Sequence, residues 1–270
     1  MIKFRDGFYA DVRVETVFTT SIKYRDGALE ESKNTTLKKA FLRVFDGDMW
    51  YYASTYKLND LQGELDRLYE NASADKKIAD NATVKRFEVN KADVKKFKAN
   101  CVKNTSLSEK AEMLTGKFAF LKSEHLKMFV ALYADKYTEI EFYSSKGAEI
   151  KYDFQLCGIR FNASFADGEN NFTAGLSKSG DCISKIHISE EEVVSFVEEC
   201  EKFLYAKPVT AGEYPVILSP ETTGVFAHES FGHKSEADFT IGDETMRREW
   251  AIGKKVGSDI LSIYDSGLED

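Results

Sequence analysis

The first part of the chain alternates between apolar and polar residues, the pattern of half-buried β-strands. Residues 9–18 alternate with a period of two, and residues 21–25 continue as a second predicted strand. Asp26-Gly27 follows and is a typical β-hairpin turn. Residues 40–54 predict a further hairpin around Asp46-Gly47-Asp48. The chain is therefore expected to open with an antiparallel meander.

Helical spacing of apolar residues appears in later stretches. Asn59 or Asp60 can cap a first helix, and Ser106 or Ser108 can start a second helical region. Ser189 precedes three glutamates and starts the most strongly indicated helix. The apolar positions at helical spacing are Leu61, Leu65, Leu68 and Ala72 in the first helix, and Leu126, Phe129, Val130 and Tyr133 in a segment late in the second region.

After residue 137 the period returns to two. Residues 139–143 and 149–152 predict a hairpin, and further strands are expected at 159–165, 171–176, 184–189 and 215–218. His187 lies in the predicted strand 184–189, where a hydrogen-bonded side chain is more common than a metal ligand. Hairpins interleaved with a few helices predict an α+β fold, with antiparallel β hairpins and sheets and packed helices.

The prolines mark the expected domain boundary. All three lie in the segment from Pro208 to Pro220. This clustering predicts a boundary between an N-terminal α+β domain, residues 1–207, and a second domain whose start is residues 208–270. A sub-boundary is possible near 100–108.

Composition narrows the functional class. The 270 residues are 43% hydrophobic with a formal net charge of −8, which favours a globular protein and argues against a direct nucleic-acid surface. The lysine-rich run 91–103 is interpreted as a solvated face. The start lacks a signal-peptide core, and no apolar run is long enough to span a membrane. The chain is therefore expected to be cytoplasmic, without a membrane partner. Its four cysteines are widely spaced and are expected to be reduced thiols.

The candidate chemistry lies between Ser219 and Asp238. Ser219 can cap a helix that has Pro220 at its first position. His228, Glu229 and His233 follow, and two imidazoles beside a carboxylate suit a metal hydrolase. The histidines would bind a zinc-like ion, and Glu229 would accept a proton from the water molecule bound to that ion.

The spacing of the two histidines requires an unusual backbone. His228 and His233 are five residues apart, roughly 140° round a regular α-helix, so a regular helix would separate them. A π-type turn with an i→i+5 hydrogen bond would return both to one face, and Gly232 could ease the distortion. The alternative interpretation is a pair of partly exposed histidines without a metal.

These residues, together with others along the chain, resemble the TldD/PmbA family, whose members are often named modulators of DNA gyrase. The family's protease subunits carry a His-Glu-x-x-x-His motif, which His228–His233 matches, while Ala237 replaces a glycine usual in the run that follows. The other matching segments are Pro215–Leu218, Gly224-Val225, Glu236–Phe239, Gly253–Ser258, Tyr9–Glu15 and Asp46–Thr55.

The resemblance implies a zinc metallopeptidase that cleaves unstructured peptides and pairs with a homologous TldD/PmbA-type subunit, as a homo- or heterodimer. It also implies a third metal ligand, a cysteine of the C-terminal half, whereas no cysteine follows His233 in this chain. Either residues 208–270 are the start of a truncated metalloprotease domain, which carries the His-Glu-x-x-x-His helix and lacks its C-terminal part, or another group supplies the third ligand. Glu236 and Asp238 are expected to hold the histidine rings or to have structural roles.

An alternative function remains. With an incomplete metal site, the chain would be a non-catalytic peptide-binding or assembly module, and it is expected to be inactive by itself.

Overall fold

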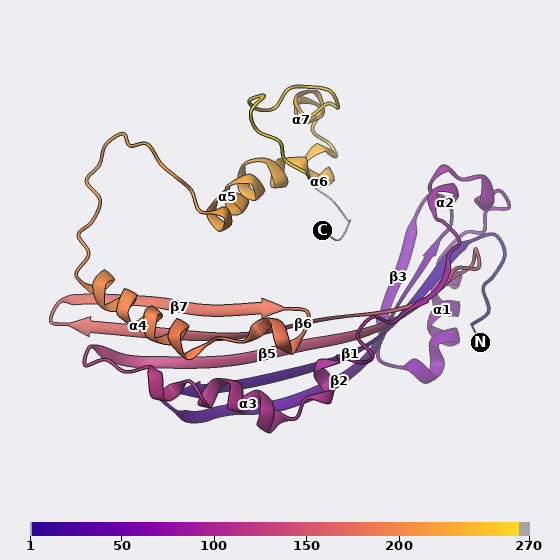
Figure 1. Cartoon of the computed structure of the whole chain (residues 1–270). Helices are drawn as coiled ribbons and strands as arrows, with labels where there is room; N and C mark the ends of the chain where they lie inside the picture. The colour runs from indigo at the N-terminus through magenta and orange to yellow at the C-terminus, as the bar shows by residue number, and fades with distance from the viewer. Residues whose placement is uncertain (1, 265–270) are drawn as a thin grey trace. The chain divides into compact units, whose positions relative to one another are not determined.

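The computed structural model describes residues 2–264, and its contacts divide the chain into two units, Met1–Lys207 and Pro208–Asp270. Within the described residues, the first unit is built on one seven-stranded sheet in the order β3-β2-β1-β5-β6-β4, with β7 also paired to β6 (Figure 1). Every pairing is antiparallel except that of β4 with β6. The predicted α+β class is therefore confirmed.

The strands differ greatly in length, and the longest would extend about 60 Å at 3.3 Å per residue. The strands are β1 Tyr9–Arg25, β2 Ala28–Phe45, β3 Trp50–Thr55, β4 Lys91–Val94, β5 Leu126–Ser144, β6 Glu149–Asp167 and β7 Asn170–Gly180. The helices of the first unit are α1 Leu61–Glu70, α2 Ala82–Arg86, α3 Leu107–Thr115 and α4 Glu190–Leu204.

The hairpin turns agree with the sequence, but the division of the first strand does not. Asp26 and Gly27 both have positive φ, 49° and 82°, as a two-residue hairpin turn of this kind requires. The two strands predicted on either side of residues 19–20 are one continuous strand, β1. Thr19 and Thr20 are paired on both sides, with β2 and β5, so the ladder continues through these polar residues.

Helices α3 and α4 pack on one face of the sheet and share its largest core. Both begin with a capping box, Ser106 with Glu109 in α3 and Ser189 with Glu192 in α4. Of the two serines predicted to start α3, Ser106 and Ser108, the cap is therefore Ser106. Their buried side chains meet alternate residues of β1, β5 and β6; the central ones are Ile22, Tyr133, Phe161, Leu114 and Val197. Asp60 likewise caps α1, whose Leu65 is buried against β1 and β2.

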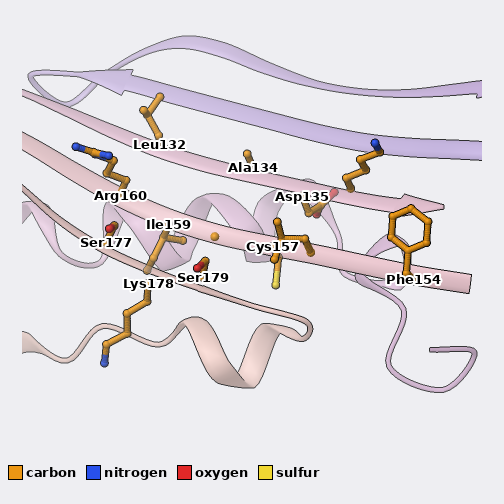
Figure 2. Close-up of a pocket in the computed structure, with 13 residues that line it drawn as sticks. Leu132, Ala134, Asp135, Phe154, Cys157, Ile159, Arg160, Ser177, Lys178 and Ser179 are labelled. Carbon is orange, nitrogen blue, oxygen red and sulfur yellow. The ribbon is translucent and has the colours of Figure 1, made fainter. Parts of the chain in front are cut away.

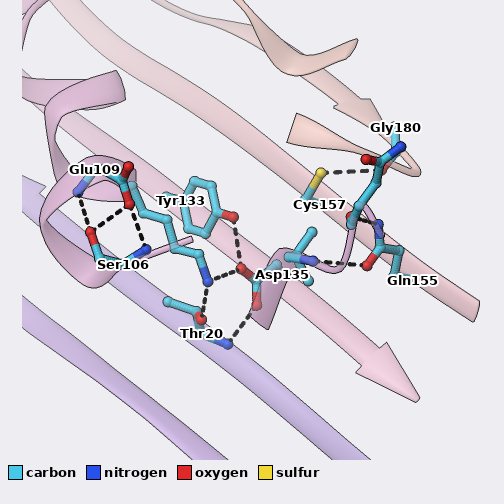
Figure 3. A network of polar contacts seen from close by, with 11 residues as sticks. Thr20, Ser106, Glu109, Tyr133, Asp135, Gln155, Cys157 and Gly180 are labelled. Carbon is cyan, nitrogen blue, oxygen red and sulfur yellow. Dashed lines mark hydrogen bonds and ion pairs between the residues drawn. The ribbon is translucent and has the colours of Figure 1, made fainter. Parts of the chain in front are cut away.

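A buried ion pair fixes α3 to the sheet (Figure 3). Lys110 Nζ lies 2.6 Å from Asp135 Oδ2, with 1% and 0% of the two side chains exposed. Lys110 also donates to Thr20 Oγ1 at 2.9 Å, while Tyr133 OH and the Thr20 N–H donate to the carboxylate. Burial raises the pKa of Tyr133, so its hydroxyl remains a donor. Every charge in this cluster therefore has partners.

The helix predicted around residues 126–133 is wrong. The segment opens β5, with Ala131 and Tyr133 in the core against α3 and α4. Val130 and Leu132 point to the opposite face of the sheet and are also partly buried. Because both faces carry apolar side chains here, the period of two is hidden, and the remaining spacing imitates a helix.

Two further predicted strands are absent. Residues 183–186 form a short 3₁₀ helix followed by coil, although Ile186 and Ile188 are buried as alternation suggested and His187 is exposed. Residues 215–218 also lie outside any described strand, with Ile217 fully exposed. Neither segment forms a β-ladder with a strand in the described structure, and without a ladder an apolar run does not form a sheet.

The second unit consists of short helices: α5 Pro220–Ala227, α6 Ala237–Thr240 and α7 Glu244–Glu249. None of its described residues is buried. Its apolar side chains are therefore exposed, among them Ile217, Ile252 and Ile260. Across the described parts of both units, no helix is long and apolar enough to cross a membrane.

Candidate metal centre

The candidate site begins at the end of α5, a helix whose start is determined by its sequence. Ser219 Oγ accepts a hydrogen bond from the Thr222 N–H at 3.2 Å, and Pro220 occupies the first turn. Glu221 adds a negative charge beside the free N–H groups. The predicted cap is confirmed, and it determines where the following residues emerge from the helix.

The chain then widens into a π-helix over His228–Gly232. The His233 N–H donates to the His228 carbonyl oxygen, an i→i+5 bond that confirms the predicted turn. A short 3₁₀ helix, His233–Ser235, follows. One widened turn thus compensates for the extra residue between the two histidines.

The turn brings the predicted site residues together. The rings of His228 and His233 have centroids 4.5 Å apart and an interplanar angle of 68°. His233 Nε2 lies 3.6 Å from Glu229 Oε2. One ligand atom from each of the three residues lies within 4.8 Å of the others. Ligand atoms at about 2 Å from a tetrahedral zinc ion stand about 3.3 Å apart, so these side chains would have to bring their ligand atoms closer by up to about 1.5 Å.

Gly232 has a smaller role than expected. Its φ and ψ are both −56°, ordinary helical values that any residue can adopt. A Cβ there would have His228 Nδ1 as its nearest neighbour, at 3.7 Å, an ordinary contact. The π-turn therefore does not require glycine, and its absent side chain instead leaves space beside the His228 ring.

Of the two carboxylates expected to support the histidines, Glu236 reaches one. Its Oε1 lies 2.5 Å from His233 Nδ1 and shares a hydrogen bond with it. This leaves Nε2, the atom nearest Glu229, for a metal, an arrangement common among zinc-binding histidines. Asp238 Oδ1 accepts from the N–H of Phe239. The contacts thus place Glu236 beside the His233 ring and give Asp238 a hydrogen bond to the next residue.

Two hydrogen bonds next to His233, which join Trp250, Ser235 and Phe231 and are called the brace below, were not predicted from the sequence. Trp250 Nε1 donates to Ser235 Oγ at 3.0 Å, and that hydroxyl donates to the Phe231 carbonyl at 2.9 Å. The Phe231 and Trp250 rings have centroids 5.7 Å apart. The brace connects the end of α7 to the turn after His233. A tryptophan just after a short amphipathic helix was the available signal.

Three of the four cysteines are poor candidates for ligands as the structure places them. Cys101, Cys157 and Cys200 are buried in the first unit. Burial raises the pKa of Cys157 and Cys200 to about 11, so both remain thiols near neutral pH. A metal would need the thiolate form.

The residues present fit a zinc ion in donor type and spacing. Two imidazoles and a carboxylate converge, and Glu236 holds one ring by its far nitrogen. The site is open: 46% of the His233 side chain and 63% of the Glu229 side chain are exposed.

Comparison with known protein families gives two matches. The model described as PmbA/TldA metallopeptidase domain 1 matches residues 10–75, and that of the PmbA/TldA metallopeptidase C-terminal domain matches 211–270. A metalloprotease of Methanocaldococcus jannaschii is 26% identical over 269 residues, covering 96% of this chain and 58% of the relative. A zinc metalloprotease TldD homolog of Saccharolobus solfataricus is 24% identical, covering 95% and 56%. The chain thus spans little more than half the length of these relatives.

Solved structures share the fold. A Bacteroides thetaiotaomicron protein named as a modulator of DNA gyrase superposes with a TM-score of 0.65 at 16% identity, over 84% of this chain and 53% of its own. A Thermotoga maritima protein with a similar name gives 0.60 at 14% identity, over 76% and 47%.

Proposed function

We propose that this chain, which belongs to the PmbA/TldA metallopeptidase family, is the zinc-binding part of a peptidase and binds the ion through His228 and His233. The observation that carries the proposal is the π-turn. It places two imidazoles five residues apart in sequence within 4.5 Å, centroid to centroid. A π-turn is rare and often functional.

Each residue has a chemical task in this proposal. Zinc in this position supplies Lewis acidity toward the scissile carbonyl and toward water. Glu229 accepts the proton of the attacking water and can return it to the leaving amine. Its carboxylate is exposed and lies beside His233 Nε2, where such a water would be. Glu236 keeps the His233 ring oriented.

Direct measurement of metal binding tests the proposal. The full chain, titrated with Zn²⁺ against a chromophoric chelator, is expected to bind one ion per chain. Circular dichroism establishes folding in the same samples. A folded chain that removes no zinc from the chelator would contradict the proposal, and would favour the non-catalytic peptide-binding or assembly module.

Glu236 provides a more specific prediction. Glu236→Ala is expected to weaken Zn²⁺ affinity by about 10- to 100-fold, the usual effect of losing the acceptor behind a metal-binding histidine. Asp238→Ala is the matched control, because its carboxylate bonds to the Phe239 N–H instead. Equal effects of the two substitutions, or none from Glu236→Ala, would refute this positioning role.

The substrate and the partner belong to the same proposal. The open site suits an unstructured peptide, which can approach the two histidines in an extended form. Exposed apolar residues of the second unit, such as Ile217 and Ile252, support association with a homologous subunit. Sedimentation equilibrium of the 30.6 kDa chain, alone and mixed with a homologous subunit, tests this. A mass that remains that of the single chain in both samples would contradict the association.

A further inference from the structure

The sheet face opposite α3 and α4 carries a hollow of about 650 Å³ over β5, β6 and β7 (Figure 2). A row of small residues forms its floor: β-ladder pairing aligns Ala134 with Gly158 and Gly158 with Ser179. The same row continues to Ser21 on β1. The hollow is therefore a trough that runs across the strands.

Larger apolar side chains wall the trough on both sides. Phe154 and Leu156 stand on one side, 40% and 59% exposed, and Leu132 lies on the other. Exposure of this extent on neighbouring apolar residues of a sheet indicates a contact surface.

The rims carry positive charge in an otherwise acidic chain. Lys136 lies beside Leu156 and Arg160 beside Leu132, and both are exposed at opposite rims. Arg160 Nε donates to Asn162 Oδ1 at 2.7 Å, which orients its guanidinium at the rim. Asp135 and Cys157, which also border the hollow, belong to the buried face with Lys110 and α4. The charge facing an occupant is therefore cationic on both sides.

The dimensions fit a helix. Lys136 and the residue opposite Arg160 are four positions apart on β5, about 13 Å at 3.3 Å per residue. An α-helix with its side chains is about 10–12 Å across. The row of small residues crosses four strands, from Ser21 on β1 to Ser179 on β7, over about 14 Å, or about ten helical residues at 1.5 Å each. A chain lying across the strands cannot join their ladders, whereas a helix satisfies its own backbone groups.

We propose that this trough binds an acidic amphipathic helix of a partner protein, with its apolar stripe on the floor and its carboxylates toward Lys136 and Arg160. This mode is the helix-in-groove type of recognition. The proposal does not rest on the metal site.

The test uses the full chain and two labelled peptides of about 18 residues, long enough to present the ten-residue contact. Both have leucine on one helical stripe, flanked by glutamate in one peptide and by lysine in the other. Fluorescence anisotropy is expected to show saturable binding of the glutamate peptide and much weaker binding of the lysine peptide. Ala134→Phe, which fills the floor at an exposed position, should weaken binding more than about tenfold.

Charge reversal and a matched control complete the design. The double variant Lys136→Glu with Arg160→Glu is expected to bind the lysine peptide more tightly than the glutamate peptide. Lys38→Glu reverses one charge of the same sign on the opposite sheet face and should alter affinity by no more than about twofold. His228→Ala and chelation should change nothing, so this result is separable from that for zinc.

Several outcomes would overturn the proposal. These are equal binding of both peptides, unchanged binding by a folded Ala134→Phe variant, or binding of anionic vesicles in preference to the glutamate peptide. Self-association that Ala134→Phe abolishes would assign the trough to a second copy of the chain.

Discussion

Replacing either His228 or His233 with alanine is expected to weaken Zn²⁺ binding by at least about 100-fold, because each would remove one of two nitrogen ligands from a small donor set. The two rings lie edge to face across the π-turn, 4.5 Å apart between centroids, so each offers its own nitrogen to the ion. Chelator competition measures the loss, and circular dichroism verifies that the variants retain the fold of the full chain.

A third histidine provides the matched control. His187 is exposed, lies in the first unit after a short 3₁₀ helix, and is not part of the site. His187→Ala should leave zinc affinity unchanged. Equal losses in all three variants would indicate non-specific coordination by surface imidazoles and contradict a defined site.

Glu229→Gln separates two roles for the carboxylate. If Glu229 is the general base, it does not hold the ion, and Glu229→Gln should change zinc affinity by no more than a few-fold. A loss of affinity as large as that of the histidine variants would instead make Glu229 a ligand. The 3.6 Å between Glu229 Oε2 and His233 Nε2 permits either role, so this variant decides between them.

Features encoded by a few adjacent residues were predictable from the sequence. The Asp26-Gly27 turn and the caps at Ser189 and Ser219 depend on local chemistry, and each lies where the sequence indicates. The π-turn belongs to the same group. Five-residue spacing of His228 and His233 can serve one ion only if the helix widens, and the structure shows this widening.

Features that depend on distant partners were not predictable. Residues 126–133 form a strand because β1 and β6 lie on either side of them. Residues 215–218 have the composition of a strand but no described neighbour to pair with. The Trp250–Ser235 bond joins segments whose proximity depends on how α7 folds back. In each case, the outcome depends on the presence or absence of tertiary contacts that local propensity does not specify.

Lys110 is the clearest example of a feature hidden in the sequence. It lies in α3, where the helical pattern of the sequence does not indicate a buried cation. Nevertheless, only 1% of its side chain is exposed. Its partner Asp135 lies in a strand 25 positions further along the chain. The Phe18 and Tyr133 rings complete the enclosure, 5.3 and 5.6 Å from the ammonium nitrogen.

Lys110→Met is therefore expected to destabilise the first unit by about 3–5 kcal/mol, because it leaves the Asp135 carboxylate buried without its counter-charge. Methionine fills the same volume, so lost packing is a minor contribution. Urea unfolding followed by circular dichroism measures the change in free energy. Lys103→Met, at an exposed position near the same helix, should shift stability by no more than about 0.5 kcal/mol.

The double variant Lys110→Met with Asp135→Asn distinguishes the effect of the charge from that of the contacts. In the unchanged protein, the Thr20 N–H donates to Asp135 Oδ1 at 3.0 Å. An asparagine oxygen can still accept this hydrogen bond, and the double variant leaves neither member of the ion pair charged. The double variant should recover more than half of the stability that Lys110→Met loses. If it is as unstable as the single variant, the hydrogen bonds of Lys110, rather than the buried charge of Asp135, determine how firmly α3 is held on the sheet.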